Sequence, residues 1–220
     1  MNAEQLARTT AALEVGYMGD NPPPLQRVSV WIYRALAAGR TVTRASIAEA
    51  MGTTEAEIDC LLAHVPASAI DVTVEGEITG FVGLSIVSAS HEFIVGSRTL
   101  YTWCAFDALF LPALIGQDAV LKTRCPETGE RIEIELSPTL IGATKPAAPV
   151  MSLAETDTAS CCDDLRAAFC SHVNMFADQG AFERWKGNRD GVVALHLDDA
   201  HQLARQRNAW RYPDLRENWA

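Results

Sequence analysis

The feature that most constrains the fold is a change in the spacing of apolar residues near residue 70. Before this point apolar residues recur at helical spacing, most clearly over residues 25–38. After it, residues 72–74 and 78–87 read as two strands around the turn Glu75-Gly76-Glu77, which predicts a β-hairpin. Helices followed by strands in this order favour the α+β class.

Three short helices are predicted before this hairpin. Prolines 22–24 precede the helix over residues 25–38, because proline suits the first turn of a helix. A second helix follows Thr43, and Thr54-Glu55-Ala56-Glu57 is a capping box that opens a third. Three helices and then a hairpin is the order of a winged helix-turn-helix, so we expect residues 1–80 to form a winged-helix-like domain.

The third helix would be the recognition helix if this domain bound DNA. Binding to DNA requires Lys or Arg side chains for the phosphates, whereas this helix carries Glu55, Glu57 and Asp59 and no basic residue before His64. The net charge of the chain is −10, which argues against nucleic acid or an anionic membrane as a partner. We therefore expect a scaffold domain without DNA contacts, in which Cys60 is a buried structural thiol.

Residues 81–220 are predicted to form a second domain, a mixed or antiparallel β-sheet core with flanking helices. Its predicted strands cover residues 91–95, 119–124 and 131–136, and its predicted helices follow Cys104 and lie near residues 160–168, 182–186 and 198–207. We interpret residues 143–150 as a Pro/Ala-rich connector and residues 170–176 more as strand than as helix. One further helix is predicted over residues 3–15.

One short segment of this second domain combines a thiol with a carboxylate. Cys104 precedes Asp107 by three residues, and on a helix these two positions share a face. The apolar stretch 108–116 follows directly. Because burying an unpaired charge is costly, a carboxylate in such a run indicates a functional site. The alternative, equally open from the residues alone, is that Asp107 faces water on an amphipathic helix.

The remaining cysteines give weaker signals. Cys170 is a second thiol in apolar surroundings, with His172 on the same side if both lie on a strand. Cys125 ends a predicted strand, where packing is its expected role, and the pair Cys161-Cys162 lies in a polar stretch and is expected to be exposed. No C-x-x-C spacing occurs.

The N-terminal residues lack the basic and apolar regions of a signal peptide. The longest apolar stretch, residues 108–116, is also too short to cross a bilayer. We therefore expect a cytoplasmic protein whose cysteines remain reduced thiols.

Two segments match a family pattern. The run from Arg98 to Gly116, with Trp103-Cys104-Ala105-Phe106-Asp107 at its centre, closely resembles the signature of the alkylmercury (organomercurial) lyases. The segment 169–173 resembles the family's second catalytic cysteine segment, although Ser171 stands where some members have another cysteine. Cys125 falls where the family has a structural third cysteine.

The resemblance implies an enzyme that cleaves carbon–mercury bonds by protonolysis, giving a hydrocarbon and Hg(II). Cys104 and Cys170 would bind the mercury of substrate and product, and Asp107 would contact it and shuttle the proton. No resident cofactor is implied, because mercury enters as substrate. Turnover would need external low-molecular-weight thiols, and the Hg(II) product would pass to mercuric reductase.

Two other functions are weighed against the lyase. The first is a sensor or buffer that binds organomercury or Hg(II) without cleaving it, against which the placement of Asp107 counts. The second is a Cys–His–Asp hydrolase using His172. A hydrolase needs an oxyanion hole, and no glycine-rich element adjoins either cysteine.

Overall fold

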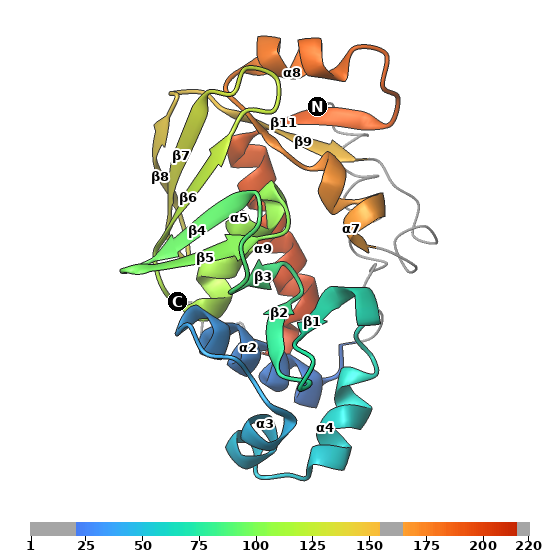
Figure 1. Cartoon of the computed structure of the whole chain (residues 1–220). Helices are drawn as coiled ribbons and strands as arrows, with labels where there is room; N and C mark the ends of the chain where they lie inside the picture. Colours follow the sequence, from blue (N-terminus) through green and yellow to red (C-terminus); the bar gives the residue numbers. More distant parts are fainter. Residues whose placement is uncertain (1–20, 155–164, 215–220) are drawn as a thin grey trace.

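The computed structural model describes residues 21–154 and 165–214 (Figure 1). The protein is α+β, as the sequence predicts, with helices packed around two antiparallel sheets. The helix predicted over residues 3–15 and the pair Cys161-Cys162 fall outside the described residues. None of the described helices has the length and apolar character needed to span a membrane.

The three predicted N-terminal helices are confirmed. They are α2 (Pro23–Ala37), α3 (Arg44–Met51) and α4 (Glu55–Leu62). Both shorter helices begin with a capping box, in which the Thr43 or Thr54 hydroxyl accepts a backbone N–H from the first turn. These helices are therefore started by local side chains rather than by burial alone.

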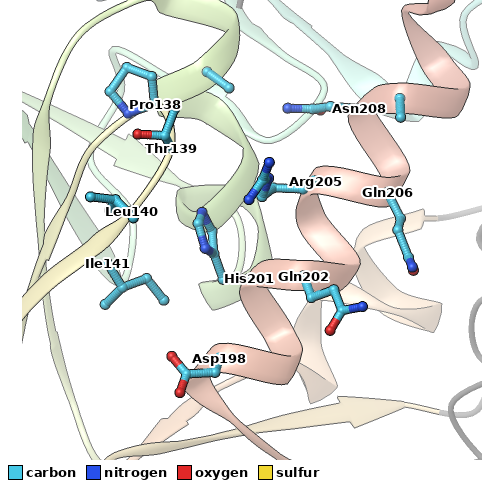
Figure 2. A pocket seen from close by; sticks show the side chains of 12 residues that line it. Pro138, Thr139, Leu140, Ile141, Asp198, His201, Gln202, Arg205, Gln206 and Asn208 are labelled. Carbon is cyan, nitrogen blue, oxygen red and sulfur yellow. The ribbon is translucent and has the colours of Figure 1, made fainter. Parts of the chain in front are cut away.

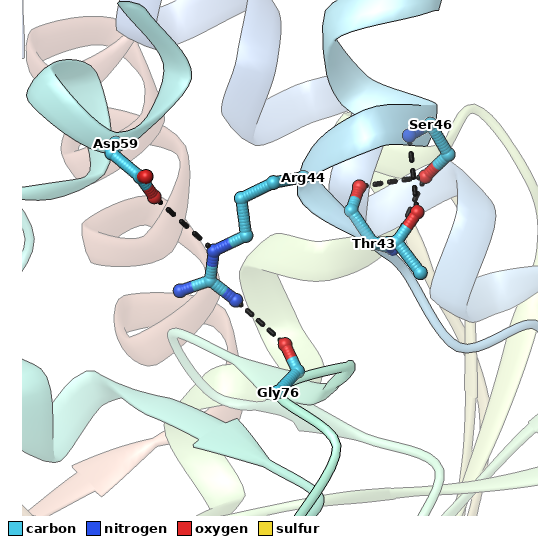
Figure 3. Close-up of polar contacts among 5 residues, drawn as sticks. All are labelled: Thr43, Arg44, Ser46, Asp59 and Gly76. Atoms are coloured by element: carbon cyan, nitrogen blue, oxygen red, sulfur yellow. Dashed lines mark hydrogen bonds and ion pairs between the residues drawn. The ribbon is translucent and has the colours of Figure 1, made fainter. Parts of the chain in front are cut away.

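Arg44 ties the two short helices to the following hairpin. Its guanidinium lies 3.4 Å from the Asp59 carboxylate on α4 and donates to the Gly76 carbonyl in the turn between β1 and β2 (Figure 3). The hairpin pairs β1 (Ile70–Val72) with β2 (Ile78–Phe81), after the short 3₁₀ helix η1 (Ala67–Ala69). This basic side chain of α3 is thus bound to acidic and carbonyl oxygens of the neighbouring α4 and hairpin.

The larger sheet has the strand order β1-β2-β3-β5-β4-β6-β7-β8, with every neighbouring pair antiparallel. Its other strands are β3 (Leu84–Ser85), β4 (His91–Val95), β5 (Arg98–Thr102), β6 (Ala119–Arg124), β7 (Arg131–Leu136) and β8 (Ile141–Lys145). The hairpin of the N-terminal part therefore continues into the sheet of the second part, and the division at residue 80 stays a prediction.

The smaller sheet has the order β10-β9-β11. Its strands are β9 (Val150–Ala154), β10 (Met175–Phe176) and β11 (Val192–His196), and the helical elements around it are α7 (Leu165–Ala168), the 3₁₀ helix η2 (Cys170–His172), α8 (Gln179–Lys186) and α9 (Leu197–Arg211). Strand β9, which precedes η2 in the chain, pairs with β10 directly after η2 and with β11 further on, so the sheet holds η2 between β9 and β10.

Helix α5 (Ala105–Ile115) lies at the centre of the core. Nearly all its residues are buried, because the segment is apolar on every face. Figure 1 shows α5 and α9 side by side, behind β4 and β5 in this view. The Asn208 side chain of α9 donates to the Phe110 carbonyl at 2.9 Å, and Arg207 stacks over the Phe110 ring. Helix α5 is thereby joined to α9 at Phe110 within the core.

Several local predictions are wrong. The connector at residues 143–150 instead contains the end of β8 and the start of β9. Residues 78–87 form two strands, because the chain breaks at Val82 and Gly83, both of which have positive φ. Residues 170–176 begin with the 3₁₀ helix η2 and reach a strand only at β10. Cys60 is exposed rather than buried, since α4 buries only Ile58 and Leu62.

Candidate active site

Cys104 and Asp107 form the start of helix α5. Cys104 is the N-cap residue, with extended backbone angles, and its N–H donates to Asp107 Oδ2 at 2.9 Å. The Asp107 N–H donates in return to the Cys104 sulfur, which completes a capping box built from a thiol and a carboxylate. The cap therefore fixes both reactive side chains on one turn of the helix.

Two contacts bring Cys170 to this turn. The Ala105 N–H at the start of α5 donates to the Val173 carbonyl, just after η2, at 3.1 Å. On the other side of η2, the Phe169 ring meets the Phe106 ring edge to face, with 6.4 Å between centroids. Cys170 lies between these two anchors and points toward α5.

The three side chains meet. The Sγ atoms of Cys104 and Cys170 and a carboxylate oxygen of Asp107 all lie within 4.8 Å of one another. All three residues are buried, with 7% of Asp107 exposed. Two thiols and a carboxylate at this separation can hold one soft metal ion. The structure thus brings together all three residues selected from the sequence.

Burial controls the protonation of this cluster. It raises the pKa of Asp107 to about 6, although hydrogen bonds from Cys104 and the charges of Arg207 and Arg166 act in the opposite direction. Burial, a hydrogen bond with Cys170 and the Asp107 charge raise the pKa of Cys104 well above its ordinary value. The cluster therefore combines a Cys104 thiol that favours its protonated form with an Asp107 carboxyl group whose pKa lies near neutral pH.

Two arginines near the cluster were not predicted from the sequence. Arg166 stacks over the Trp103 ring, 3.6 Å from its centroid, and lies 2.7 Å from the Asp71 carboxylate. Arg207 is buried on α9, where its neighbours are aromatic rings. Neither arginine carries a local sequence signal, because each reaches the site through contacts with distant segments.

The other singled-out residues lie outside the cluster. Ser171 and His172 are exposed on η2, so only Cys170 of this segment turns inward. Cys125 is buried, which alone would raise its pKa. Hydrogen bonds from the Thr128 hydroxyl and from backbone N–H groups, among them that of Ala177, outweigh burial and lower the pKa of Cys125. Cys125 is therefore a buried thiol outside the cluster, and its packing role stays a prediction.

A separate hollow of about 790 Å³ runs along α9 (Figure 2). Asp198, His201 and Arg205 of the helix face Leu140 and Ile141 across it. No cysteine lines this hollow. It therefore lacks the soft ligands that the Cys104 cluster offers.

The family model and the similar proteins of known function all point to the same enzyme family. A family model described as alkylmercury lyase matches residues 84–208. An alkylmercury lyase from Bacillus cereus is 33% identical over 190 residues, which cover 84% of this chain and 84% of that protein. One from Streptomyces lividans is 34% identical over 204 residues, covering 92% of this chain and 91% of that protein.

A solved structure shares the fold. The crystal structure of the mercury-bound form of MerB2 superposes with a TM-score of 0.75 and 21% sequence identity. The match covers 94% of this chain and 99% of that one. The arrangement of helices and sheets described above is thus the arrangement of that protein.

Proposed function

The chain belongs to the alkylmercury lyase family and is a carbon–mercury lyase, and we propose that Cys104, Cys170 and Asp107 cleave its organomercurial substrate by protonolysis. The observation that carries this assignment of roles is the meeting of two thiols and one carboxylate within 4.8 Å in the protein interior. Thiolates are the preferred ligands of a soft cation such as mercury.

The reaction begins when one cysteine binds the mercury of R–Hg⁺ and releases its thiol proton to solvent. A single thiolate forms a stable linear R–Hg–S species, so the carbon–mercury bond stays intact. A second thiolate then adds to mercury and pushes electron density onto the carbon. Because coordination to a metal deprotonates a thiol, binding itself overcomes the high pKa of buried Cys104.

Asp107 carries the proton between these steps. The carboxylate accepts the proton of the second thiol and then donates it to the carbon as the carbon–mercury bond breaks. The bonding pair stays with carbon, giving R–H, and mercury remains as Hg(II) on two thiolates. A carboxyl pKa of about 6 suits both steps, because it lies near the working pH.

The proposal extends to product release. The oxidation state of mercury does not change, so the chemistry needs no redox cofactor. Two buried thiolates hold Hg(II) tightly, and we expect release to require external low-molecular-weight thiols or transfer to a partner such as mercuric reductase. Reduced cysteines are needed throughout, which fits a cytoplasmic location.

We also propose that the N-terminal helices and hairpin form a winged-helix-like scaffold. Helix order and the hairpin after α4 support this interpretation. Helix α4 has an acidic first turn and carries no Lys or Arg, and Arg44, the one basic residue of α3, is paired with Asp59, whereas DNA binding requires cations for the phosphates.

Incubation with phenylmercury and excess thiol tests the proposed roles. We expect benzene from the wild-type protein and none above background from Cys104→Ala or Cys170→Ala, since each variant loses one of the two thiolates. Gas chromatography of the headspace measures the product.

Cys60→Ala is the matched control, because Cys60 is an exposed thiol on α4. It should release benzene at the wild-type rate. Mercury binding without benzene in the wild-type protein would indicate a buffer and would overturn the proposed chemistry.

A further inference from the structure

Gly83, between β2 and β3, lies directly against the proposed proton carrier. A Cβ atom at this position would stand 2.5 Å from Cγ, 2.6 Å from Oδ1 and 2.9 Å from Cβ of Asp107. Real side chains do not approach so closely, and the atoms met are the short, rigid part of the aspartate. Gly83 also has φ of +98°, a conformation that favours glycine. The Asp107 carboxyl group thus rests on the bare backbone of Gly83.

The backbone around Gly83 is held in place from three sides. The buried Tyr33 hydroxyl donates to the Val82 carbonyl at 3.0 Å, and the Val82 N–H donates to the Ala69 carbonyl at 2.9 Å. The Trp103 N–H donates to the Gly83 carbonyl at 3.0 Å, one residue before Cys104. Val82 itself has φ of +40°, a strained conformation for a β-branched residue. Such strain persists only where surrounding contacts hold the backbone.

We propose that Gly83 and Tyr33 are positioning residues for the cleavage reaction: Tyr33 fixes the Val82–Gly83 turn, and the turn fixes the Asp107 carboxyl group beside the two thiols. The inference rests on the proposed role of Asp107. Tyr33 lies on α2, so the N-terminal helical part affects the cleavage rate by holding this turn in place.

The position of the carboxyl group matters because it must take a proton from sulfur and deliver it to carbon. Its Oδ2 is held by the Cys104 N–H, and its opposite side is closed by Gly83. A displacement of about 1 Å in a reacting group costs up to about 10²-fold in rate. A methyl group at residue 83 forces a shift of this kind without removing either thiol.

Gly83→Ala and Gly96→Ala form a matched pair for the first test. Gly96 also has positive φ, +58°, but nothing lies within 4 Å of an added Cβ. Both variants therefore carry backbone strain, and only Gly83→Ala meets Asp107. In steady-state assays with phenylmercury and excess thiol, we expect Gly83→Ala to bind mercury stoichiometrically with kcat reduced 10- to 100-fold and KM little changed. Gly96→Ala should keep both values, and equal kcat for the two variants would overturn the proposal.

Thermal unfolding keeps the proposal testable if Gly83→Ala is poorly folded. Gly83→Ala should lower Tm more in the wild-type background than in an Asp107→Ala background, which removes two of the three contacted atoms. If Gly83→Ala lowers Tm equally in both backgrounds, contact with Asp107 is not the reason that residue 83 must be glycine.

Tyr33→Phe tests whether the Tyr33 hydroxyl positions the Val82–Gly83 turn. It removes only the Tyr33 hydroxyl, which holds the Val82 carbonyl and is also hydrogen-bonded to Tyr212. We expect a lower kcat, unchanged mercury stoichiometry and retained near-ultraviolet circular dichroism. A folded Tyr33→Phe variant with wild-type kcat would exclude Tyr33 from positioning. If Asp107→Asn itself keeps the wild-type rate, the proposed function fails. If Asp107→Asn is inactive but Gly83→Ala and Tyr33→Phe are not impaired, only this inference fails.

Discussion

Burial of the Asp107 carboxyl group lowers the stability of the folded protein and favours proton transfer. Its carboxyl group is buried, and burial holds its pKa at about 6 instead of the ordinary 3.8. The Cys104 thiol and N–H and the charges of Arg207 and Arg166 limit this rise without cancelling it. At neutral pH the protein therefore keeps a charged group in an environment that disfavours charge, which is useful for proton transfer and costly for folding.

This cost predicts a pH dependence of stability. The folded protein retains the Asp107 proton at pH values where the unfolded chain has lost it, so the free energy of unfolding falls as pH rises from about 4 to about 6. The difference in pKa corresponds to roughly 3 kcal/mol. We expect Asp107→Asn to be more stable than wild type by up to this amount above pH 7, and to match it near pH 4. Urea unfolding across this range measures both.

The comparison between the two proteins is the control, because other titrating groups affect both alike. A constant difference in unfolding free energy between pH 4 and pH 8 would contradict the raised pKa of Asp107.

At the residue scale, the sequence predicts which side chains are reactive better than it predicts how exposed each side chain is. The thiol and the carboxylate of α5 are conspicuous because a charge is rare in so apolar a run. The exposure of Cys60 is not predicted, since its apolar neighbours give no measure of which helix face is covered. Gly83 leaves a detectable signal, because it and Gly80 are glycines inside an apolar strand pattern, which indicates a close backbone approach. Arg166 leaves none.

At the element scale, helix α5 is started by the same two residues that are proposed to react. Cys104 accepts the N–H of Asp107, and Asp107 accepts the N–H of Cys104. The N-terminal end of a helix has unpaired N–H groups, so these bonds stabilise the helix as well as orient the side chains. Reactivity and local folding thus depend on the same pair.

This dual role predicts different effects for two substitutions of Cys104. Serine is a preferred N-cap residue and keeps the acceptor, whereas alanine removes it, at a cost of about 1 kcal/mol. We expect Cys104→Ser to be closer to wild type in the free energy of unfolding than Cys104→Ala, measured by urea denaturation at one pH. Both variants should release no hydrocarbon. Equal destabilisation of the two would argue against the capping role.

Elements with strong local signals are predicted well. Capping boxes define the starts of α3 and α4, and alternation of apolar and charged residues defines β7. Strand β8 lies at the edge of the sheet and is mostly exposed, so it lacks an apolar pattern. The 3₁₀ helix η2 is too short for any periodicity to show.

At the scale of the whole molecule, the site exists because two distant segments meet at one turn. The smaller sheet holds η2, and the bond from Ala105 to Val173 joins it to α5. No periodicity in the sequence predicts this meeting. Only the family resemblance suggested that Cys104 and Cys170 act together, and the packing of Phe106 on Phe169 shows how the fold achieves it.

Single turnover in D₂O tests the central claim most directly. Wild-type protein loaded with one equivalent of phenylmercury should release benzene carrying one deuterium, because the hydrogen added to carbon comes from an exchangeable group. Asp107→Asn should bind the same equivalent of mercury and release essentially no benzene. Mass spectrometry of the headspace gives both the yield and the isotope content. Wild-type release from Asp107→Asn, or benzene without deuterium, would contradict proton delivery by this carboxyl group.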